Sequence, residues 1–311
     1  IAERNNHWER LRRKDSHIII GARSAIFAPA VDIGLIVMDE EHDPSYKQED
    51  MTRYHARNVA EWRAQAHHCP LVLGSATPSI QSYYKAQEGQ YTLLKMPTRV
   101  FNQPMPRVAI VDMKEEMLHG NYSVFSDAMV NLITSTLERK EQMIMLLNRR
   151  GYSTFVMCRT CGKPIQCPHC DVAMVYHQDN DELKCHYCEY HEPIPKVCPK
   201  CHSTKIKFFG SGTEKVEEEL RRRFPNARVV RLDQDVVLKK GRGESVLHDF
   251  RNHKYDILLG TQMVSKGHDF HNVTAVGILT ADSVLNIPVY KEAERTFALL
   301  KQTAGRAGRG D

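Results

Sequence analysis

The sequence has no long hydrophobic run and no low-complexity tract. Its longest apolar runs, residues 33–38 and 143–147, are far shorter than the ~18 residues that a membrane helix needs, so we expect no membrane span. No basic start followed by an apolar stretch marks a signal peptide near the first residue. The chain begins at Ile1, and its last residues run through a motif, so we interpret both ends as cuts within a longer chain.

The composition excludes the disordered, fibrous and collagen-like classes of protein. Apolar residues make up 41% and charged residues 26% of the 311 positions, values that are typical of globular proteins. The length suits about two domains of roughly 150 residues each. Lys and Arg number 43 against 38 Asp and Glu, which leaves a net charge of +5. This balance favours a polyanionic partner, although solvated surface charge gives similar totals.

Cysteine is concentrated in one segment of the chain. Eight of the nine cysteines form four C-x-x-C pairs, and Cys69 stands apart as an ordinary thiol. Without a secretion signal we expect a reducing, cytoplasmic compartment, so disulfide or redox use is the lesser alternative. Two thiolates separated by two residues suit one zinc ion, and tetrahedral zinc takes four ligands. The sequence therefore predicts two structural zinc sites, with these ligands: Cys158, Cys161, Cys167, Cys170, Cys185, Cys188, Cys198 and Cys201.

The spacing leaves two ways of sharing the ions. The two inner pairs enclose only residues 171–184, which favours a nested arrangement: pairs two and three on one ion, pairs one and four on the other. An interleaved pairing stays possible. Closed four-cysteine sites leave no open position for catalysis, so we expect this module to hold shape or to bind a partner.

Outside the cysteine segment, short apolar runs alternate with helical patterns. An alternation of this kind predicts an α/β fold with parallel sheets, whose ligands bind at the carboxyl ends of the strands. Three prolines in residues 97–120 mark a break between two α/β lobes. Five apolar runs are followed directly by polar turns: 18–20, 35–38, 71–73, 143–147 and 256–259.

Two polar motifs carry the candidate chemistry. Asp39-Glu40-Glu41-His42 follows an apolar run, where one carboxylate can bind Mg²⁺ and its neighbour can polarise a water for attack on a γ-phosphate. A short acidic run is also a common solvated turn. In the last motif Arg306 and Arg309 are three residues apart, so on a helix they share a face and could both reach phosphates. The alternative there is a flexible basic tail.

Together these motifs resemble a known family. The segments 39–42, 74–78, 260–270 and 302–309 resemble motifs II, III, V and VI of superfamily 2 helicases. The four cysteine pairs and three further segments narrow the match: 21–27, 148–151 and 210–214. With them, essentially the whole chain resembles the bacterial replication restart helicases, the primosomal protein N′ family. The resemblance implies two RecA-like parallel-sheet motor lobes, the first truncated, with an inserted two-zinc module. The implied domains are 1–96 (partial first lobe), 97–120 (linker), 121–156 (start of the second lobe), 157–204 (zinc insertion) and 205–311 (remainder of the second lobe).

The resemblance also implies an activity and its partners. It implies an ATP-driven, Mg²⁺-dependent DNA helicase that moves 3′ to 5′, recognises stalled or abandoned replication forks and helps to reload the replicative helicase. The implied partners are forked and single-stranded DNA, other primosome proteins, single-stranded DNA-binding protein and the replicative helicase loading machinery.

Individual roles follow from the same resemblance. Asp39 holds Mg²⁺, Glu40 activates the attacking water, and Arg306 and Arg309 form an arginine-finger pair. Gly267 and Gln302 complete the nucleotide-binding set. The segment 43–57 resembles the family's aromatic-rich loop, in which rings stack on bases and cations meet phosphates. The expected DNA contacts are Arg23, Tyr46, Lys47, Arg53, Tyr54 and Thr77, with Arg57 as a further cation of the loop.

One departure from the family limits the expected activity. The G-x-x-x-x-G-K-[ST] phosphate loop does not occur in these residues, and neither do the family's amino-terminal DNA-binding domain and the part beyond motif VI. Segment 210–215 does not replace the phosphate loop, because its lysine does not follow a glycine directly. Without backbone amides and a lysine around the phosphates, we expect this chain alone to be a poor or inactive ATPase. The alternative function is a non-catalytic zinc scaffold that binds DNA or primosome partners.

Overall fold

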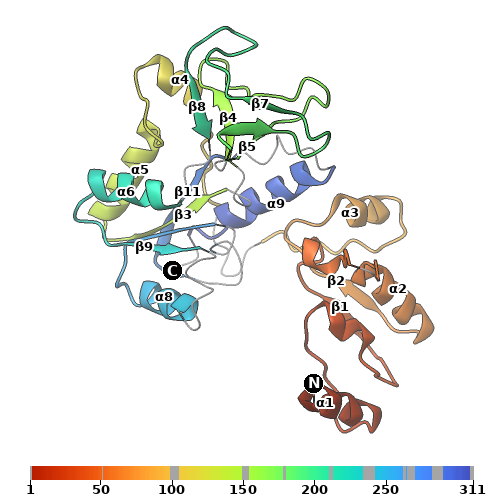
Figure 1. The fold of residues 1–311 in the computed structure, drawn as a ribbon. Coiled ribbons are helices and arrows are strands. Elements are labelled where there is room, and N and C mark those ends of the chain that lie inside the picture. The colour runs from red at the N-terminus through yellow and green to blue at the C-terminus, as the bar shows by residue number, and fades with distance from the viewer. Residues whose placement is uncertain are drawn as a thin grey trace. The chain divides into compact units, whose positions relative to one another are not determined.

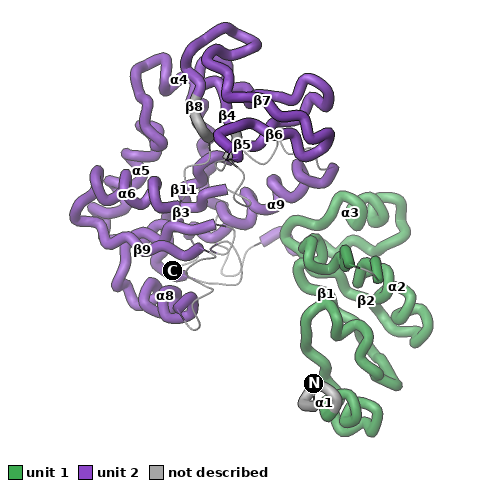
Figure 2. Tube along the Cα trace, viewed as in Figure 1, with its two compact units in different colours: residues 1–95 green, residues 96–311 purple. Residues whose placement is uncertain are grey.

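The computed structural model describes residues 2–50, 52–98, 105–148, 154–177, 180–209, 213–233, 242–261, 264, 270–281 and 290–308. The chain divides into two units, residues 1–95 and 96–311, which are coloured separately in Figure 2. No helix among the described residues is long and apolar enough to cross a bilayer.

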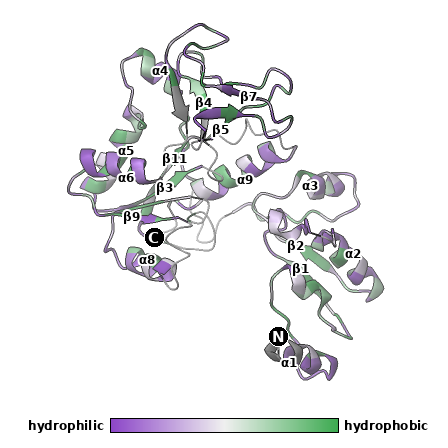
Figure 3. Cartoon of the chain, viewed as in Figure 1, coloured by the Kyte–Doolittle hydropathy of each residue, from purple (hydrophilic) through white to green (hydrophobic). Residues whose placement is uncertain are grey.

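A two-stranded parallel sheet organises the first unit. Strand β1 (Ile36–Met38) pairs with β2 (Leu71–Leu73) so that Met38 lies opposite Leu73. Helix α2 (Ala56–Ala66) packs on the sheet through Ala56 and Ala60, which cluster with Met38. The remaining elements are α1 (Ala2–Arg12), the 3-10 turns η1 (Arg23–Phe27) and η2 (Pro44–Tyr46), and α3 (Ile80–Gln87). Figure 3 shows β1 and β2 in the hydrophobic colour.

Side-chain caps fix where the helices of this unit begin. The ring of His55 accepts a hydrogen bond from the N–H of Arg57 at the start of α2, and the Ser79 hydroxyl accepts one from the N–H of Ser82 in α3.

The expectation of a strand at residues 18–20 is wrong. Ile18 and Ile20 are 80% and 94% exposed, and the described residues offer no neighbouring strand to satisfy the backbone groups of this run.

A four-stranded parallel sheet forms the centre of the second unit, in the order β11-β3-β10-β9. Strands β11, β3 and β9 are labelled in Figure 1. The strands are β3 (Gln142–Leu147), β9 (Val229–Leu232), β10 (Ile257–Gly260) and β11 (Val273–Leu279). Every residue of β3 is buried, as expected for a strand that is covered on both faces. The strands predicted near 143–147 and 256–259 are therefore confirmed, and the sheet is parallel as predicted.

Helices cover both faces of this sheet. Met143, Met145 and Leu147 of β3 pack with α5 (Asp127–Glu138) and α6 (Thr213–Arg223) in one cluster. Ile144 and Leu146 point to the opposite face and pack with α8 (Arg242–Arg251) and α9 (Glu292–Ala304). The alternation of side chains along a strand produces these two layers. The result is an α/β lobe that is wound on both faces, as the sequence predicts.

The cysteine-rich segment forms a separate antiparallel sheet with the order β7-β6-β5-β4-β8. Its strands are β4 (Thr154–Cys158), β5 (Val175–His177), β6 (Glu182–Lys184), β7 (His191–Pro193) and β8 (Ile206–Phe209). The first and last strands pair with each other, with Cys158 opposite Ile206, so the module leaves and rejoins the lobe at one place. It has its own small core, which includes Val156, Met174 and Leu183.

The described residues of the segment interpreted as a linker include a helix. Helix α4 (Met113–Leu118) begins behind Asp112, whose carboxylate accepts a hydrogen bond of 2.8 Å from the N–H of Lys114. The compact units divide the chain between Lys95 and Met96. The finer domain boundaries drawn from the sequence stay predictions.

Candidate functional site

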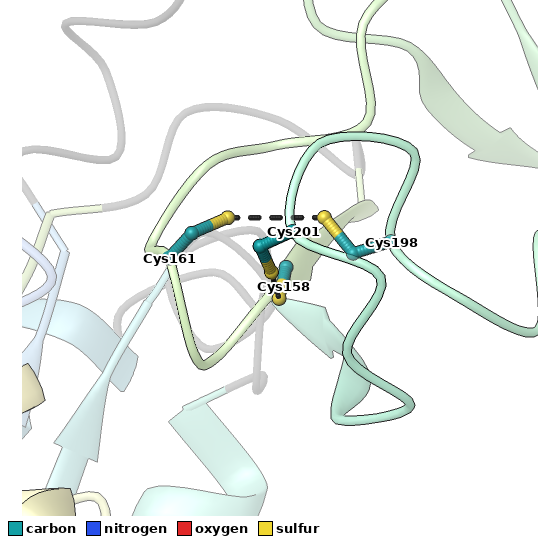
Figure 4. A group of neighbouring side chains, drawn as sticks. All are labelled: Cys158, Cys161, Cys198 and Cys201. Carbon is teal, nitrogen blue, oxygen red and sulfur yellow. Dashed lines mark hydrogen bonds between the residues drawn. The ribbon is translucent and has the colours of Figure 1, made fainter.

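The eight paired cysteines gather into two groups of four. One group is Cys158, Cys161, Cys198 and Cys201, and the other is Cys167, Cys170, Cys185 and Cys188. Within each group all the Sγ atoms lie within 4.8 Å of one another. This grouping is the nested one of the two arrangements that the sequence permits. Figure 4 shows the side chains of the first group pointing toward one another from two separate segments.

The sulfur positions fit tetrahedral zinc. With Zn–S bonds of about 2.3 Å, neighbouring sulfurs of a tetrahedral site lie about 3.8 Å apart. The Sγ atoms of Cys161 and Cys198 are 3.8 Å apart, and those of Cys158 and Cys201 are 3.5 Å apart. In the other group the distance from Cys167 to Cys188 is 3.5 Å. These distances are too long for disulfides, which span about 2.05 Å, and all eight cysteines are free thiols.

The four C-x-x-C pairs share one backbone turn. In each, the carbonyl of the first cysteine accepts a hydrogen bond of 2.8–3.0 Å from the N–H four residues later. The N–H of that cysteine donates in turn to the carbonyl five residues later. The residue four positions on always has a positive φ, between 56° and 67°. This turn ties the two cysteines of each pair into one knuckle, and its left-handed positions are Gly162, Asp171, Glu189 and His202.

Backbone amides favour the thiolate form at one cysteine of each group. Burial opposes ionisation of Cys158, but hydrogen bonds from the amide of Cys161, the thiol of Cys201, the amide of Thr160 and the thiol of Cys198 outweigh it and lower its pKa to about 6. The amide of Cys188 likewise lowers the pKa of Cys185 to about 7. Neighbouring thiols act in the opposite direction at Cys170, whose pKa they and burial raise to about 12. A bound cation is what allows four clustered sulfurs to be deprotonated together. The two groups therefore support two zinc ions.

The acidic turn lies at the carboxyl end of β1. Asp39 and Glu40 are both exposed, and the Asp39 carboxylate accepts a hydrogen bond of 2.9 Å from the N–H of Glu40. The hydroxyl of Tyr46 donates to the carbonyl of Asp39 at 2.7 Å, and burial together with the nearby Asp39 carboxylate raises the pKa of this tyrosine. Two exposed carboxylates at a strand end provide the oxygen ligands that Mg²⁺ prefers. The carboxylates of Asp39 and Glu40 therefore have the chemistry to hold Mg²⁺.

The third acidic residue of the motif has a different environment. Glu41 is 2% exposed, and its carboxylate accepts hydrogen bonds from the N–H of Ser79 at 2.6 Å and the hydroxyl of Ser82 at 2.9 Å. It also pairs with Arg57 at 3.3 Å. Arg57 is 3% exposed, so the expectation that it serves as an exposed cation of the loop is wrong. Sequence reasoning missed this network, because a glutamate inside an acidic run gives no local signal of burial.

The aromatic-rich loop is held by an expected DNA contact that lies outside the loop, Arg23 of η1. Arg23 donates hydrogen bonds to the carbonyls of Ser45 at 2.8 Å and Lys47 at 2.7 Å. Its guanidinium also lies 5.8 Å from the ring centroid of Tyr54. Lys47 and Arg53 are exposed. The side chains of Arg23, Tyr46 and Tyr54 thus shape the loop, and two exposed cations line it.

Thr77 differs from the other expected DNA contacts, because the residue is only 5% exposed. Its N–H donates to the hydroxyl of Ser75 at 2.9 Å, which places it inside the turn that follows β2. A direct contact between Thr77 and a strand stays a prediction, and this burial weighs against it.

The last motif lies partly within the described residues. Gln302 is a partly buried residue of α9, which ends at Ala304 with Gly305 as its C-cap. Arg306 therefore follows the helix in a turn, and the expectation that it occupies a helical face is wrong at this position. The reason is local, since two glycines, Gly305 and Gly308, favour a turn here, and Gly308 has a φ of 65°. Gly267 and Arg309 lie outside the described residues.

Comparison with known proteins identifies similar sequences. A profile described as "PriA DNA helicase Cys-rich region (CRR) domain" matches residues 167–193, and one described as "Helicase conserved C-terminal domain" matches residues 194–311. The chain is 53% identical over 307 residues to the replication restart protein PriA of Bacillus subtilis, covering 99% of this chain and 38% of that protein.

Further relatives give the same picture. The identity to the PriA of Synechocystis sp. is 46% over 318 residues, covering 99% of this chain and 38% of that protein. For the PriA of Haemophilus influenzae it is 41% over 304 residues, covering 98% of this chain and 41% of the relative. The chain thus spans about two fifths of the length of these relatives.

Proposed function

Because the chain belongs to the family of the replication restart protein PriA, we propose that it forms part of the motor of an ATP-dependent DNA helicase that moves 3′ to 5′. In this proposal the helicase recognises stalled or abandoned replication forks and helps to reload the replicative helicase. It acts in the cytoplasm, where its paired cysteines stay reduced and available to zinc.

One observation carries the proposal most directly: Asp39 and Glu40 lie exposed at the carboxyl end of β1, beside the turn that follows β2. Asp39 would hold the magnesium ion of bound ATP, which screens the charge of the phosphates. Glu40 would orient and deprotonate the attacking water. Gly267, Gln302, Arg306 and Arg309 would complete the nucleotide site, with the two arginines meeting the charge that develops on the γ-phosphate.

The DNA partner in this proposal is a single strand that leaves a fork. Lys47 and Arg53 are exposed cations that could pair with phosphates, and Tyr46 and Tyr54 offer rings on which bases stack. Primosome proteins, single-stranded DNA-binding protein and the loading machinery of the replicative helicase are the proposed protein partners. The two zinc ions would hold the inserted module in shape, because closed four-cysteine sites leave no position for substrate.

The experiment that tests the proposal is DNA-stimulated ATP hydrolysis by the full-length protein that carries this chain. Glu40→Gln keeps the size of the side chain and removes the base, so we expect hydrolysis to fall by about 100-fold or more while single-stranded DNA still binds. Glu88→Gln, a matched change at an exposed residue after α3, should leave both unchanged. Hydrolysis that survives Glu40→Gln would contradict the assigned role.

A second measurement uses the 311 residues alone. We expect no DNA-stimulated hydrolysis from them, because the sequence has no G-x-x-x-x-G-K-[ST] loop to hold the phosphates. Measurable hydrolysis by this chain would overturn that expectation.

The alternative function is a non-catalytic zinc scaffold that binds DNA or primosome partners. It is favoured by one feature, the inserted module with its own sheet and core and two closed metal sites. The same ATPase assay separates the two, because a scaffold would bind DNA without any Glu40-dependent hydrolysis in the full-length protein.

A further inference from the structure

Two histidines of the cysteine-rich module face each other outside the four-cysteine groups. The Nε2 atoms of His177 and His186 are 3.1 Å apart, whereas the centroids of the two rings are 5.1 Å apart. The short distance between the nitrogens and the longer one between the ring centres show that the rings meet through their Nε2 edges. His177 is half-buried and His186 is exposed, so water and small ions can reach both nitrogens.

The backbone holds both histidines on rigid elements. His177 is the last residue of β5, which pairs with β6, and the two strands lie side by side in Figure 2. His186 directly follows Cys185 in a metal knuckle, where the N–H of Glu189 donates to the carbonyl of Cys185 at 3.0 Å. A strand end and a knuckle limit how far the two rings can separate. The chain therefore supplies the preorganisation that a chelate requires.

The distance between the nitrogens suits a shared metal ion. With metal–nitrogen bonds of about 2.0–2.1 Å, two nitrogens 3.1 Å apart subtend an angle of about 98° at the ion. This angle lies between the values for octahedral or square-planar sites, about 90°, and for tetrahedral sites, about 109°. A hydrogen bond from one neutral ring to the other has the same length, and a metal titration separates the two arrangements.

The surroundings favour a cation that keeps open coordination positions. Glu182 lies opposite His177 in the ladder, so the two side chains project from the same face of the sheet. Its carboxylate accepts a hydrogen bond from the side-chain amide of Asn180 at 3.2 Å and adds a negative charge near the histidines. Among the described residues only the cysteines form groups of three or more metal ligands, so this pair offers two ligands. Water would fill the other positions, unlike those of a closed four-cysteine site.

We propose that His177 and His186 form a third metal site, which binds a divalent ion that prefers imidazole, such as Zn²⁺ or Ni²⁺, through both Nε2 atoms. Without the ion, a hydrogen bond between the rings requires one Nε2 to carry a proton. On binding, that ring exchanges protons with the solvent and carries its proton on Nδ1, so both Nε2 lone pairs face the ion and no net proton is released. The bound ion ties the end of β5 to the knuckle. The site requires neither DNA binding nor ATP hydrolysis.

The test is equilibrium dialysis of the full 311-residue chain, with zinc in both four-cysteine groups, against Ni²⁺ at neutral pH. Atomic spectrometry measures nickel and zinc per chain at each nickel concentration. We expect the unaltered chain to bind a first equivalent of nickel while it keeps its zinc. His177→Asn and His186→Asn should each weaken this binding by about tenfold or more, because a chelate loses its advantage when either ligand is removed.

Two comparisons distinguish a chelate from independent histidines. The variant with both substitutions should bind nickel within about threefold of either single variant, because one remaining imidazole adds little. His191→Asn makes the same change at an exposed residue of β7 in the same module and should bind nickel like the unaltered chain. Losses that add up in the double variant would show two independent ligands and would overturn the chelate.

Magnetic resonance gives a readout that is decisive even if a variant loses its zinc or does not fold. Because Ni²⁺ is paramagnetic, less than one equivalent should broaden the ring signals of His177 and His186 in the unaltered chain before that of His191. Ring signals that broaden no earlier than that of His191 would overturn the site. Nickel affinity that is unchanged in both single variants would also overturn it, and would leave a hydrogen bond between the two rings.

Discussion

The Nδ1 atom of His42 lies 2.7 Å from the hydroxyl of Ser75, and this contact joins the turn after β1 to the turn after β2. The backbone strengthens the junction, because Gly74 donates to the carbonyl of Met38 at 2.8 Å and accepts from the N–H of Glu41 at 3.0 Å. Strands β1 and β2 have only three residues each, so the pairing between them is short. The two turns therefore extend the pairing, and the acidic motif and the Gly74–Ser79 turn behave as one unit.

The nested arrangement of the zinc ligands predicts a distinctive pattern of metal loss. Because Cys158 and Cys198 share one site, replacing both with Ala should remove one zinc ion per chain. Replacing Cys158 and Cys167, which belong to different sites, should remove both ions. Zinc measured by atomic spectrometry on the purified variants decides the matter. In an interleaved arrangement, with pairs one and three on one ion, the variant that lacks Cys158 and Cys198 would lose both ions instead of one.

Each knuckle has one residue with a left-handed backbone. Substitutions at two of these positions should therefore change the free energy of unfolding in opposite directions. Gly162 has a φ of 67°, so Gly162→Ala should lower the free energy of unfolding of the zinc-bound chain by about 1 kcal/mol. His202 has a φ of 56°, and His202→Gly should raise it by about 0.5 kcal/mol, after the entropy of glycine is subtracted. Urea titration of both variants in the presence of zinc is the measurement. Equal signs for the two would contradict the shared turn.

The role of Arg23 in holding the aromatic-rich loop predicts faster local opening when it is removed. Arg23→Ala deletes two charge-assisted hydrogen bonds to backbone carbonyls, so exchange of the amides near residues 45–48 should accelerate by about tenfold or more. Arg23→Lys is the matched control, because it keeps the charge but not the fork that reaches both carbonyls. If exchange in Arg23→Ala equals that of the unaltered chain, the loop is held by other contacts.

The ion pair between Arg228 and Asp256 predicts an acid-sensitive contribution to stability. Burial opposes ionisation of Asp256, but hydrogen bonds from the side chain and backbone of Arg228 outweigh it and hold its pKa below the ordinary value. A lowered pKa in the folded state stabilises the fold above the pKa of the unfolded chain, and the gain is lost as pH falls through the lowered value.

Asp256→Asn should therefore cost about 1 kcal/mol at neutral pH and progressively less in acid. Urea unfolding of both proteins over a range of pH measures the difference. A penalty that stays constant down to the most acidic pH at which the chain is folded would show that the charge of Asp256 is not the cause.

The sequence by itself determined the parts of this protein that depend on local spacing. The strands at 71–73 and 143–147 and the buried faces of α5 and α6 follow from apolar periodicity, which needs only neighbouring residues. The metal ligands follow from the C-x-x-C spacing, because two residues are what one knuckle requires. The position of Asp39 and Glu40 at a strand end follows from the pattern of the run before them.

Only the tertiary structure decided the features that depend on distant segments. Glu41 and Arg57 look like two more surface charges in the sequence, and they are buried because Ser79 and Ser82 come to them from the far side of β2. The run at 18–20 has the composition of a strand, but a strand also needs a partner, and the described residues provide none there. Local sequence specifies which conformations are favourable, whereas burial and pairing depend on which segments meet when the chain folds.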